Sequence, residues 1–355
     1  MEKGCKKLII KILTLSLGLM MLSCDSNYEN SNSSEFQKGR MKEALFKVNS
    51  QYGYCFVNRE GTPVIPPQFD YANDFSEGFA LVKIGKNCGF INDTGAIVIH
   101  PRFQSTTILS QGFSEGLAAV AIANKWGYID NTGQFVINPQ FYMAYKFSEG
   151  LAMVTPEAGG FGFVDRNGNM VIDAQFDIAS DFSEGLSCVS INDRYGYIDK
   201  TGQFVINPQF DKASSFSEGM AAVKTGDKWG YIDKHGKIVI NPQFDVAWEF
   251  SEGLAGIEID DKWGFIDKAG KTVITPQFAS VTKFSEGLAR VAIGNEDWSK
   301  WKWGFIDKTG KFVINPQFES ASDFTNGLAE VKKDGYMDYI DKTGKSIWDN
   351  LNDTK

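Results

Sequence analysis

The sequence predicts an all-β fold in which tandem repeats of about 34 residues stack as an open solenoid or superhelical array. Three observations lead to this prediction. A Trp-Gly dipeptide or a variant of it recurs at regular spacing, each copy carries short β-branched and aromatic runs joined by tight turns, and the pattern continues without an internal linker through residues 51–348. The nine dipeptide positions are Tyr54-Cys55, Cys88-Gly89, Trp126-Gly127, Phe161-Gly162, Tyr195-Gly196, Trp229-Gly230, Trp263-Gly264, Trp303-Gly304 and Met337-Asp338.

Each repeat begins with a predicted β-hairpin, which is clearest in residues 229–240. Residues 229–233 and 237–240 are rich in aromatic and β-branched side chains, and a Lys-His-Gly turn separates them. A three-residue loop that ends in glycine matches a type I turn followed by a left-handed residue, a conformation that glycine adopts without steric cost. The next segment, Asn-Pro-Gln-Phe, contains a proline that lacks a backbone donor, so it marks the end or the edge of a strand.

The rest of the repeat predicts a turn and a third short strand. Phe244, Ala247 and Phe250 fall at every third position, which favours a tight turn or one turn of helix over a strand. A Ser-Glu-Gly turn then leads into the apolar residues 254–257. Each repeat is therefore expected to supply about three strands, and its hairpin is apolar on both faces, so only stacking of neighbouring repeats can bury it.

The two ends of the repeated region favour an open array over a closed one. The region has nine hairpins but eight strands that follow a Ser-Glu-Gly-type turn, so the terminal repeats are partial and are expected to act as caps. A closed propeller usually completes its last blade with strands from both ends of the chain, whereas both terminal hairpins are intact here. A four-stranded blade also usually takes about 40 residues or more. A β-propeller is therefore the alternative.

Several motifs recur together in a fixed order, namely Lys-Trp-Gly-aromatic-Ile-Asp, Thr-Gly, Pro-Gln-Phe and Phe-Ser-Glu-Gly-Leu-Ala. In this combination the repeats resemble the WG repeats (WG-containing repeat family) of bacteria, and the resemblance extends over residues 51–348. It implies repetition and export but no agreed activity. The first, second, fourth, fifth and ninth units depart from the pattern locally.

The N-terminal residues predict export and a lipid anchor. Lysines precede an apolar run at residues 12–22, which is too short to cross about 30 Å of hydrocarbon as a helix. The sequence Met-Leu-Ser-Cys that ends at Cys24 resembles the lipobox of bacterial lipoproteins. Residues 1–23 are therefore expected to be a cleaved signal peptide and Cys24 the lipidated N-terminus. The Ser- and Asn-rich character of residues 24–50 predicts a flexible tether.

The charge of the chain argues against nucleic acid as a partner. The formal net charge is -8, and loss of four lysines and one glutamate with the signal peptide takes it to -11. Such a chain lacks the basic stripe that phosphate contacts require, so membrane association is expected only through the lipid anchor. Cys55, Cys88 and Cys188 are odd in number and have no framework spacing, so they are interpreted as small apolar residues. Residues 349–355 form a short C-terminal tail.

No pattern in the sequence predicts catalysis, a cofactor or a metal site. His100 and His235 occupy repeat positions held elsewhere by Asn, Thr or Ala and are expected on the surface. Two rows of carboxylates also recur. Each Asp precedes a tight turn and each Glu lies beside a turn glycine, so a structural role is favoured over cation binding. The rows are Asp130, Asp165, Asp199, Asp233, Asp267, Asp307 and Asp341, and Glu77, Glu115, Glu149, Glu184, Glu218, Glu252 and Glu286.

The tryptophans divide into a periodic set and an irregular set. Phe161, Tyr195 and even Cys88 replace the periodic tryptophans, which favours a packing role for that position. An insertion of six residues before Trp303 adds Trp298 and Trp301, and insertions in repeat arrays map to loops on one face. Together with Trp248, these two are the candidate binding residues, although an insertion that folds its tryptophans inward is the alternative. A second insertion, of four residues, falls within residues 106–112.

These observations predict a non-enzymatic, membrane-tethered repeat protein that binds an envelope or host protein. It is expected to be exported and to remain anchored at the cell envelope or cell surface. The alternative is a carbohydrate- or peptidoglycan-binding module that uses Trp248, Trp298 and Trp301 to stack on sugar rings.

Overall fold

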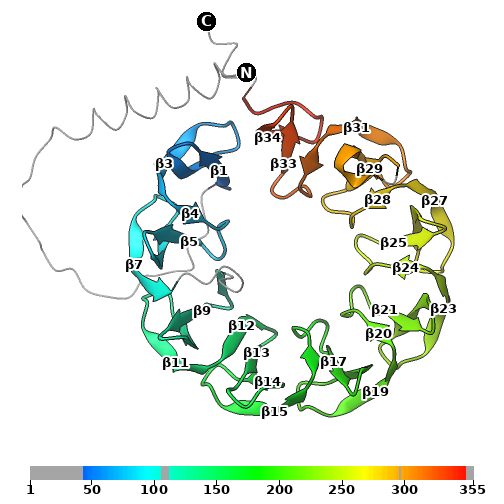
Figure 1. The fold of residues 1–355 in the computed structure, drawn as a ribbon, viewed down its shortest axis with the longest axis horizontal. Coiled ribbons are helices and arrows are strands. Elements are labelled where there is room, and N and C mark those ends of the chain that lie inside the picture. The colour runs from blue at the N-terminus through cyan, green and yellow to red at the C-terminus, as the bar shows by residue number, and fades with distance from the viewer. Residues whose placement is uncertain (1–42, 105–111, 296, 349–355) are drawn as a thin grey trace, which may run out of the picture.

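The computed structural model describes residues 43–104, 112–295 and 297–348, which form a closed ring of nine small antiparallel sheets (Figure 1). The predicted signal peptide, the lipidation site Cys24 and the C-terminal tail lie outside the described residues. The first strand already begins at Phe46. Among the described residues, no helix is both long and apolar enough to span a bilayer.

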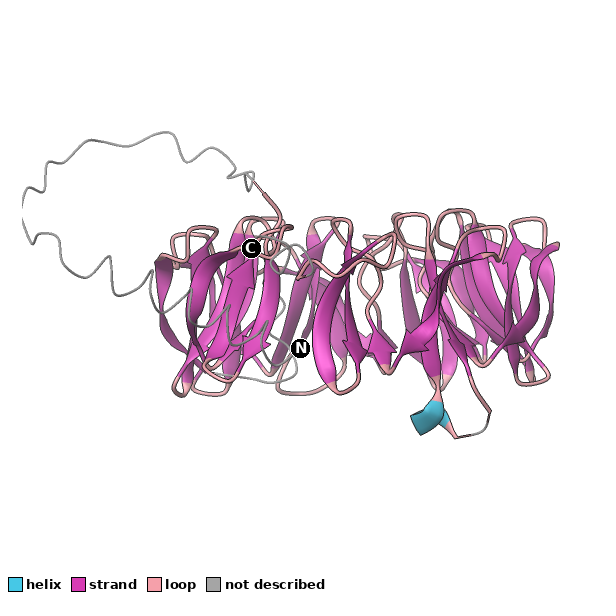
Figure 2. Ribbon diagram, turned by 90° about the horizontal axis from the view of Figure 1, so that it is seen from above, coloured by secondary structure: helices cyan, strands magenta, loops and turns pink. Residues whose placement is uncertain are grey.

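The prediction of an open solenoid is wrong, because the repeats are the blades of a nine-bladed β-propeller. Figure 2 shows the ring from the side as a flat body one blade thick. Intact terminal hairpins are compatible with closure because the ring does not use a shared blade. The first and last sheets each have three described strands, and they meet through side chains instead of exchanging a strand.

Each complete blade contains four strands in sequence order from the channel outwards, named first to fourth. The first strands are β4 (Tyr71–Ala72), β8 (Phe113–Ser114), β12 (Met143–Ser148), β16 (Ile178–Ala179), β20 (Lys212–Ala213), β24 (Val246–Ala247), β28 (Ser280–Val281) and β32 (Ser320–Ala321). The second strands are β1 (Phe46–Ser50), β5 (Phe79–Ile84), β9 (Leu117–Ile122), β13 (Leu151–Thr155), β17 (Ser187–Ile191), β21 (Met220–Thr225), β25 (Leu254–Ile259), β29 (Ala289–Ile293) and β33 (Leu328–Lys333).

The third strands carry the Trp-Gly dipeptide or its variants, and the fourth strands carry the Pro-Gln-Phe motif or its variants. The third strands are β2 (Gly53–Val57), β6 (Asn87–Asn92), β10 (Lys125–Ile129), β14 (Phe161–Val164), β18 (Arg194–Ile198), β22 (Lys228–Asp233), β26 (Lys262–Asp267), β30 (Lys302–Ile306) and β34 (Tyr336–Asp341). The fourth strands are β3 (Pro63–Phe69), β7 (Ile97–Gln104), β11 (Phe135–Phe141), β15 (Met170–Phe176), β19 (Phe204–Phe210), β23 (Ile238–Phe244), β27 (Thr272–Phe278) and β31 (Phe312–Phe318).

The expectation of three strands per repeat missed the first strand. The segment after Phe244 was expected to turn or to form one turn of helix, but Val246 and Ala247 pair with Glu258 and Ile257 as β24. In most blades this strand has two residues, which is too short for a periodic signal, and it allows a four-stranded blade to fit into about 34 residues.

Where a fourth strand contains this proline, the residue lies inside the strand and does not end it, and β15 has Ala174 at that position. Pro242, for example, belongs to β23, which pairs with β22 alone and is the outermost strand of its blade. An outer edge tolerates a residue without a backbone donor, so the prediction of an edge position is confirmed.

The core of the protein lies between the blades. Nine clusters of buried side chains each join residues from two neighbouring blades, and the ninth joins the last blade to the first. This arrangement buries both faces of every hairpin, as the apolar pattern of the repeat requires.

The junction between blade 9 and blade 1 closes the ring. Phe46 packs edge-on against Tyr339 with ring centroids 5.5 Å apart, and the Tyr339 hydroxyl donates to the Lys47 carbonyl oxygen at 2.8 Å. Trp348 lies against Gly61, at the repeat position where the other blades place a fourth-strand isoleucine against the glycine of the next hairpin. The closing contacts therefore reproduce the geometry of an ordinary junction.

Candidate functional site

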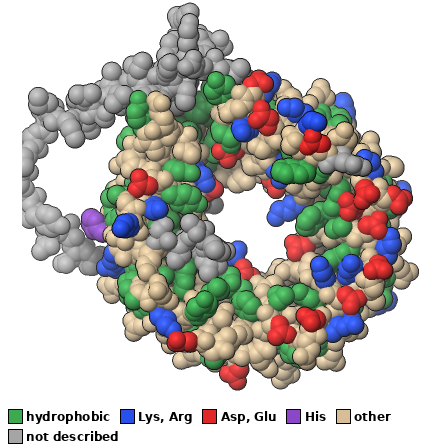
Figure 3. All heavy atoms as spheres, in the orientation of Figure 1, with side chains coloured by type: hydrophobic (Ala, Val, Ile, Leu, Met, Phe, Trp, Pro, Cys, Tyr) green, Lys and Arg blue, Asp and Glu red, His purple; other side chains and the backbone are tan. Residues whose placement is uncertain are grey.

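The ring has two faces that differ in their turns. We call the face with the turns between first and second strands and between third and fourth strands the Glu–Lys face. The opposite face, with the turns between second and third strands, is called the insertion face because the six-residue insertion projects from it as a single 3-10 turn, η1 (Trp298–Lys300) (Figure 2). Figure 3 shows the central channel that runs between the two faces.

The repeated aspartates stabilise the hairpin turns, as predicted. Asp199 is representative, because its Oδ1 atom accepts hydrogen bonds from the backbone amides of Thr201 at 2.8 Å and Gln203 at 3.1 Å. The side-chain hydrogen bond from Thr201 contributes most to holding the pKa of Asp199 below its usual range. These carboxylates are therefore occupied within their own turns.

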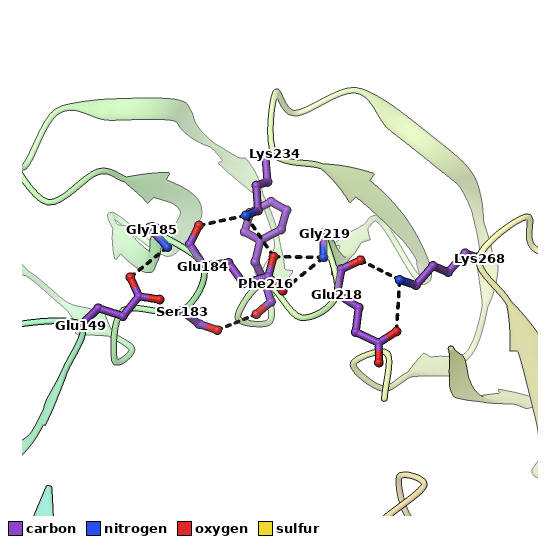
Figure 4. A network of polar contacts seen from close by, with 9 residues as sticks. All are labelled: Glu149, Ser183, Glu184, Gly185, Phe216, Glu218, Gly219, Lys234 and Lys268. Carbon is purple, nitrogen blue, oxygen red and sulfur yellow. Dashed lines mark hydrogen bonds and ion pairs between the residues drawn. The ribbon is translucent and has the colours of Figure 1, made fainter. Parts of the chain in front are cut away.

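The repeated glutamates link neighbouring blades on the Glu–Lys face, an arrangement that the sequence did not show. Glu218 accepts from the amide of Gly253 in the next blade at 3.0 Å, and Lys268 of that blade pairs with Glu218 at 3.1 Å. Ser217 of the same turn donates to the Phe250 carbonyl oxygen at 2.8 Å. Figure 4 shows the equivalent network one blade earlier, around Glu184, Gly219 and Lys234.

Two of these glutamates are expected to make the stability of the fold depend on pH. Burial opposes ionisation of Glu252, but hydrogen bonds from Lys308 and from the Gly287 amide outweigh it and lower the pKa, and Glu149 behaves in the same way. A lowered pKa in the folded state stabilises the protein above the ordinary glutamate pKa of about 4.3, and this stabilisation is lost as the pH falls through the folded-state value.

We expect Glu149→Gln combined with Glu252→Gln to reduce the free energy of unfolding by about 1 kcal/mol at pH 7, since both side chains are partly exposed and solvent screens their ion pairs. Denaturant titrations at several pH values should show this difference shrinking towards zero near pH 3. Asp227→Asn, on the opposite face, is the control. A difference that stays constant with pH would contradict an ionic origin.

The Trp-Gly dipeptide is a packing device. Trp126 and Trp263 are buried, and the glycine lies where the fourth strand approaches closely. A Cβ atom on Gly230 would lie 2.5 Å from the Ile240 carbonyl oxygen and 2.6 Å from the Pro242 nitrogen. The pairing of β22 with β23 shifts register at this point, so the dipeptide marks a recurrent bulge of the repeat rather than a ligand site.

The insertion places its two tryptophans differently. Trp298 is 77% exposed at the start of η1. Asp297 caps this turn through its side chain, which accepts from the Ser299 amide at 3.2 Å, and also pairs with Lys300. Trp301 folds back, donates its indole N–H to the Asn295 carbonyl oxygen at 2.7 Å and packs edge-on against Trp303. The insertion therefore presents one tryptophan and anchors itself with the other.

Trp248 lies one blade earlier, directly after β24. Its ring stacks on Trp263 with centroids 5.6 Å apart and planes inclined by 22°, and 49% of the residue remains exposed. Blades 7 and 8 thus contain Trp248, Trp263, Trp298, Trp301 and Trp303, which are five of the eight tryptophans in the chain. Of these five, Trp248 and Trp298 are the exposed ones, and exposed aromatic side chains are typical of binding surfaces.

Sequence reasoning missed two charged groups beside these tryptophans. Arg290 lies over the Trp303 ring, with the guanidinium carbon 4.7 Å from the ring centroid, and its Nε is 3.6 Å from Asp323 Oδ1. Glu258 lies opposite Trp263 in the pairing of β25 with β26. Both occupy repeat positions that are uncharged in most other blades, and this departure from the repeat was the available signal.

The remaining titratable groups offer no further centre in the part of the chain that the structure describes. His100 and His235 are exposed, as predicted, and no group of three or more potential metal ligands lies within the described ranges. Cys55, Cys88 and Cys188 are buried outside disulfides. Burial, with a smaller contribution from Glu249, raises the pKa of Cys188 to about 12, so this thiol remains protonated and unreactive.

Nine four-stranded or three-stranded blades around a channel, joined by apolar junctions, define the class of protein as a β-propeller. The chain belongs to the family described as WG containing repeat, whose model matches residues 54–88, 89–126, 126–155, 161–195, 195–229, 229–263, 263–296 and 303–336. The resemblance inferred from the repeat motifs is therefore confirmed.

Solved structures show similarity in fold alone. The chain is similar to a eukaryotic initiation factor at a TM-score of 0.60 and 14% identity, over 86% of this chain and 95% of that one. BamB from Moraxella catarrhalis is more distant, with a TM-score of 0.44 and 10% identity over 75% of this chain and 94% of that one. No curated protein matches the chain in sequence.

Proposed function

We propose that this propeller is exported, anchored to a membrane through lipid on Cys24, and acts without catalysis by binding another envelope or host protein on its insertion face. The lipobox-like sequence before Cys24 supports the anchor, and the Ser- and Asn-rich segment after it supports a tether between membrane and propeller. A flat ring of short loops on a rigid scaffold suits the presentation of a binding surface.

One observation carries the proposal, namely the exposed Trp298 on a short and well-anchored turn. The Asp297 cap and the Trp301 indole hold this turn in place, so little conformational entropy is lost when a partner covers it. Tryptophan is enriched among the residues that dominate protein–protein binding energies. A flat exposed indole also fits a sugar ring, so glycan binding is the alternative function.

In-cell photo-crosslinking from position 300 tests this proposal. We expect a defined protein to be captured, and Trp298→Ala should weaken its binding at least tenfold, as loss of a central aromatic contact does. Tyr142→Ala is the matched control, because Tyr142 is 57% exposed and lies on the insertion face of blade 4. Capture that is equal in both variants would contradict the proposal.

Glycan binding has a separate outcome. The purified chain would then bind cell-wall or glycan panels, and Trp298→Ala combined with Trp301→Ala would abolish that binding.

Membrane association is tested by fractionation, where Cys24→Ser should release the propeller into the soluble fraction. Retention of the Cys24→Ser protein in the membrane fraction would contradict the lipid anchor.

A further inference from the structure

The junction between blades 7 and 8 contains an indole that the repeat pattern does not predict. At the position of Trp248 most other blades have serine, threonine or asparagine. The ring stacks on Trp263, and Gly256 on the adjacent strand makes room for it, since a Cβ at position 256 would lie 2.9 Å from Trp248 Cδ1. Two coordinated departures from the repeat therefore place a half-exposed indole here.

Glu258 lies on the same side of this blade as the two indoles. Residues two apart on a strand point to the same face, and so do residues directly opposite each other in an antiparallel pair. Gly256 and Glu258 are two apart on β25, and Glu258 is paired with Trp263. The carboxylate of Glu258 therefore stands beside the stacked pair of Trp248 and Trp263.

The face of blade 8 that meets this site leads into the insertion. Ala289 and Val291 of β29 pack in one cluster with Trp263, and Ile293 lies two residues further along the same face. Ile293 is 48% exposed and precedes the insertion that carries Trp298. The site at Trp248 and Glu258 and the insertion therefore belong to the same junction on the insertion face.

Negative charge accumulates around Glu258. Its pKa is raised, chiefly by burial and further by Asp261 and Asp245, while hydrogen bonding to Trp263 acts in the opposite direction. Two lysines of this region interact with other carboxylates. Lys228 pairs with Asp245, and Lys283 acts on Glu249. A carboxylate whose ionised form is disfavoured by burial and by like charges gains from an added cation.

The neighbouring junction shows which group this environment accepts. In blade 8 the positions of Gly256 and Trp263 are held by Arg290 and Trp303. There the Arg290 guanidinium covers the Trp303 ring at 4.7 Å and faces Asp323, whose Oδ1 also accepts from the Thr282 hydroxyl at 2.8 Å. An indole face beside a carboxylate thus already holds a guanidinium, supplied by the chain itself, one blade away.

We propose that the junction between blades 7 and 8 binds an arginine side chain of the partner protein, which stacks on Trp248 and pairs with Glu258. This inference rests on the proposed function, because it specifies the chemistry of the partner segment on the same face. Arginine fits because its planar guanidinium stacks on aromatic rings and pairs with carboxylates at the same time. The acidic character of the chain, with a formal net charge of -8, favours such a partner.

Titration of the full chain with two short capped peptides tests the proposal. One peptide contains a single arginine among glycine and serine, and the other contains citrulline, which keeps the shape and removes the charge. The indole N–H signal of Trp248 in NMR spectra, assigned with Trp248→Phe, reports binding. We expect the arginine peptide to shift this signal and to bind at least about fivefold more tightly than the citrulline peptide.

Substitutions at the two contacts complete the test. Trp248→Ala should weaken arginine-peptide binding about tenfold and Glu258→Gln about fivefold, whereas Glu157→Gln, an exposed glutamate on the same face of blade 4, should leave it unchanged. Trp248→Leu removes the aromatic ring but keeps a large apolar side chain against Trp263, so it separates loss of stacking from loss of packing. An arginine peptide that binds no better than the citrulline peptide, or equally well to Glu258→Gln, overturns the proposal.

Failure of this inference is distinguishable from failure of the proposed function. A partner whose capture needs Trp298 but is unaffected by Trp248→Ala and Glu258→Gln refutes the arginine site alone. Peptide binding that depends on Trp248 and Glu258, without any partner whose capture depends on Trp298, refutes the proposed function and leaves the arginine site standing.

Discussion

Gly230→Ala is expected to lower the free energy of unfolding by about 3 kcal/mol, at the upper end of the range for overpacking. The added Cβ would lie 2.5 Å from the Ile240 carbonyl oxygen, and backbone atoms of a paired strand cannot move aside as a flexible side chain can. The new methyl group must therefore separate β22 from β23 or break their pairing. Denaturant-induced unfolding of the full chain, followed by tryptophan fluorescence, measures the loss.

Gly226→Ala is the control for this prediction. Gly226 has a φ of 61° and an exposed position where an added methyl group would meet nothing within 4 Å, so alanine there adds only left-handed backbone strain of about 1 kcal/mol. Equal losses for the two variants would show that close strand approach is not the reason for the glycine. Blade 1 has Cys55 at the repeat position of Gly230. There the fourth strand approaches Gly53 instead, where an added Cβ would lie 2.6 Å from the Phe69 carbonyl oxygen.

Trp348→Ala is expected to cost about 3 kcal/mol and to open the ring at the junction of blades 9 and 1. Trp348 packs on Gly61 beside the cluster of Phe46, Val57 and Tyr339, and truncation of a large aromatic residue leaves a cavity. At the other junctions the chain passes from a fourth strand into the first strand of the next blade, whereas within the described ranges no chain connection links blade 9 to blade 1, so side-chain contacts hold this junction. Amide hydrogen exchange should therefore accelerate in β1, β2 and β34 first.

Trp298→Ala provides the matched control, since it also removes an indole but from a 77% exposed position. It should change the free energy of unfolding by less than about 0.5 kcal/mol, as expected for a surface substitution. Faster exchange spread evenly over all blades of the Trp348→Ala protein would contradict a localised opening, and so would unchanged exchange in β1 and β34.

The repeat, the hairpin turns and the packing role of the Trp-Gly position were predictable from sequence. The Asp-x-Thr-Gly turns depend only on residues within four positions of one another, as Asp199 and its two amide donors show. Burial of Trp263 follows from the replacement of its equivalents by other apolar residues. Such features are local or repeated, so the sequence displays each of them several times.

The insertion was also visible in the sequence as a candidate site, but the orientation of its side chains was not. Trp298 and Trp301 are three residues apart with similar neighbours, and only the Asn295 carbonyl oxygen and the Trp303 ring determine that Trp301 turns inward. Arg290 and Glu258 escaped notice because their roles depend on neighbours across a sheet and across a junction. Nothing in the spacing of residues 258 and 263 alone indicates that they face each other.

Sequence by itself determined that the chain is a β-repeat array of the WG family, with Trp248, Trp298 and Trp301 outside the periodic tryptophan position. Only the tertiary structure decided that the array closes into a nine-bladed ring. Closure depends on the small rotation between neighbouring blades, which many side-chain contacts at each junction set together, and a periodic sequence specifies the unit without specifying that angle. The ends meet through the packing of Trp348, Tyr339 and Phe46, which no repeat motif predicts.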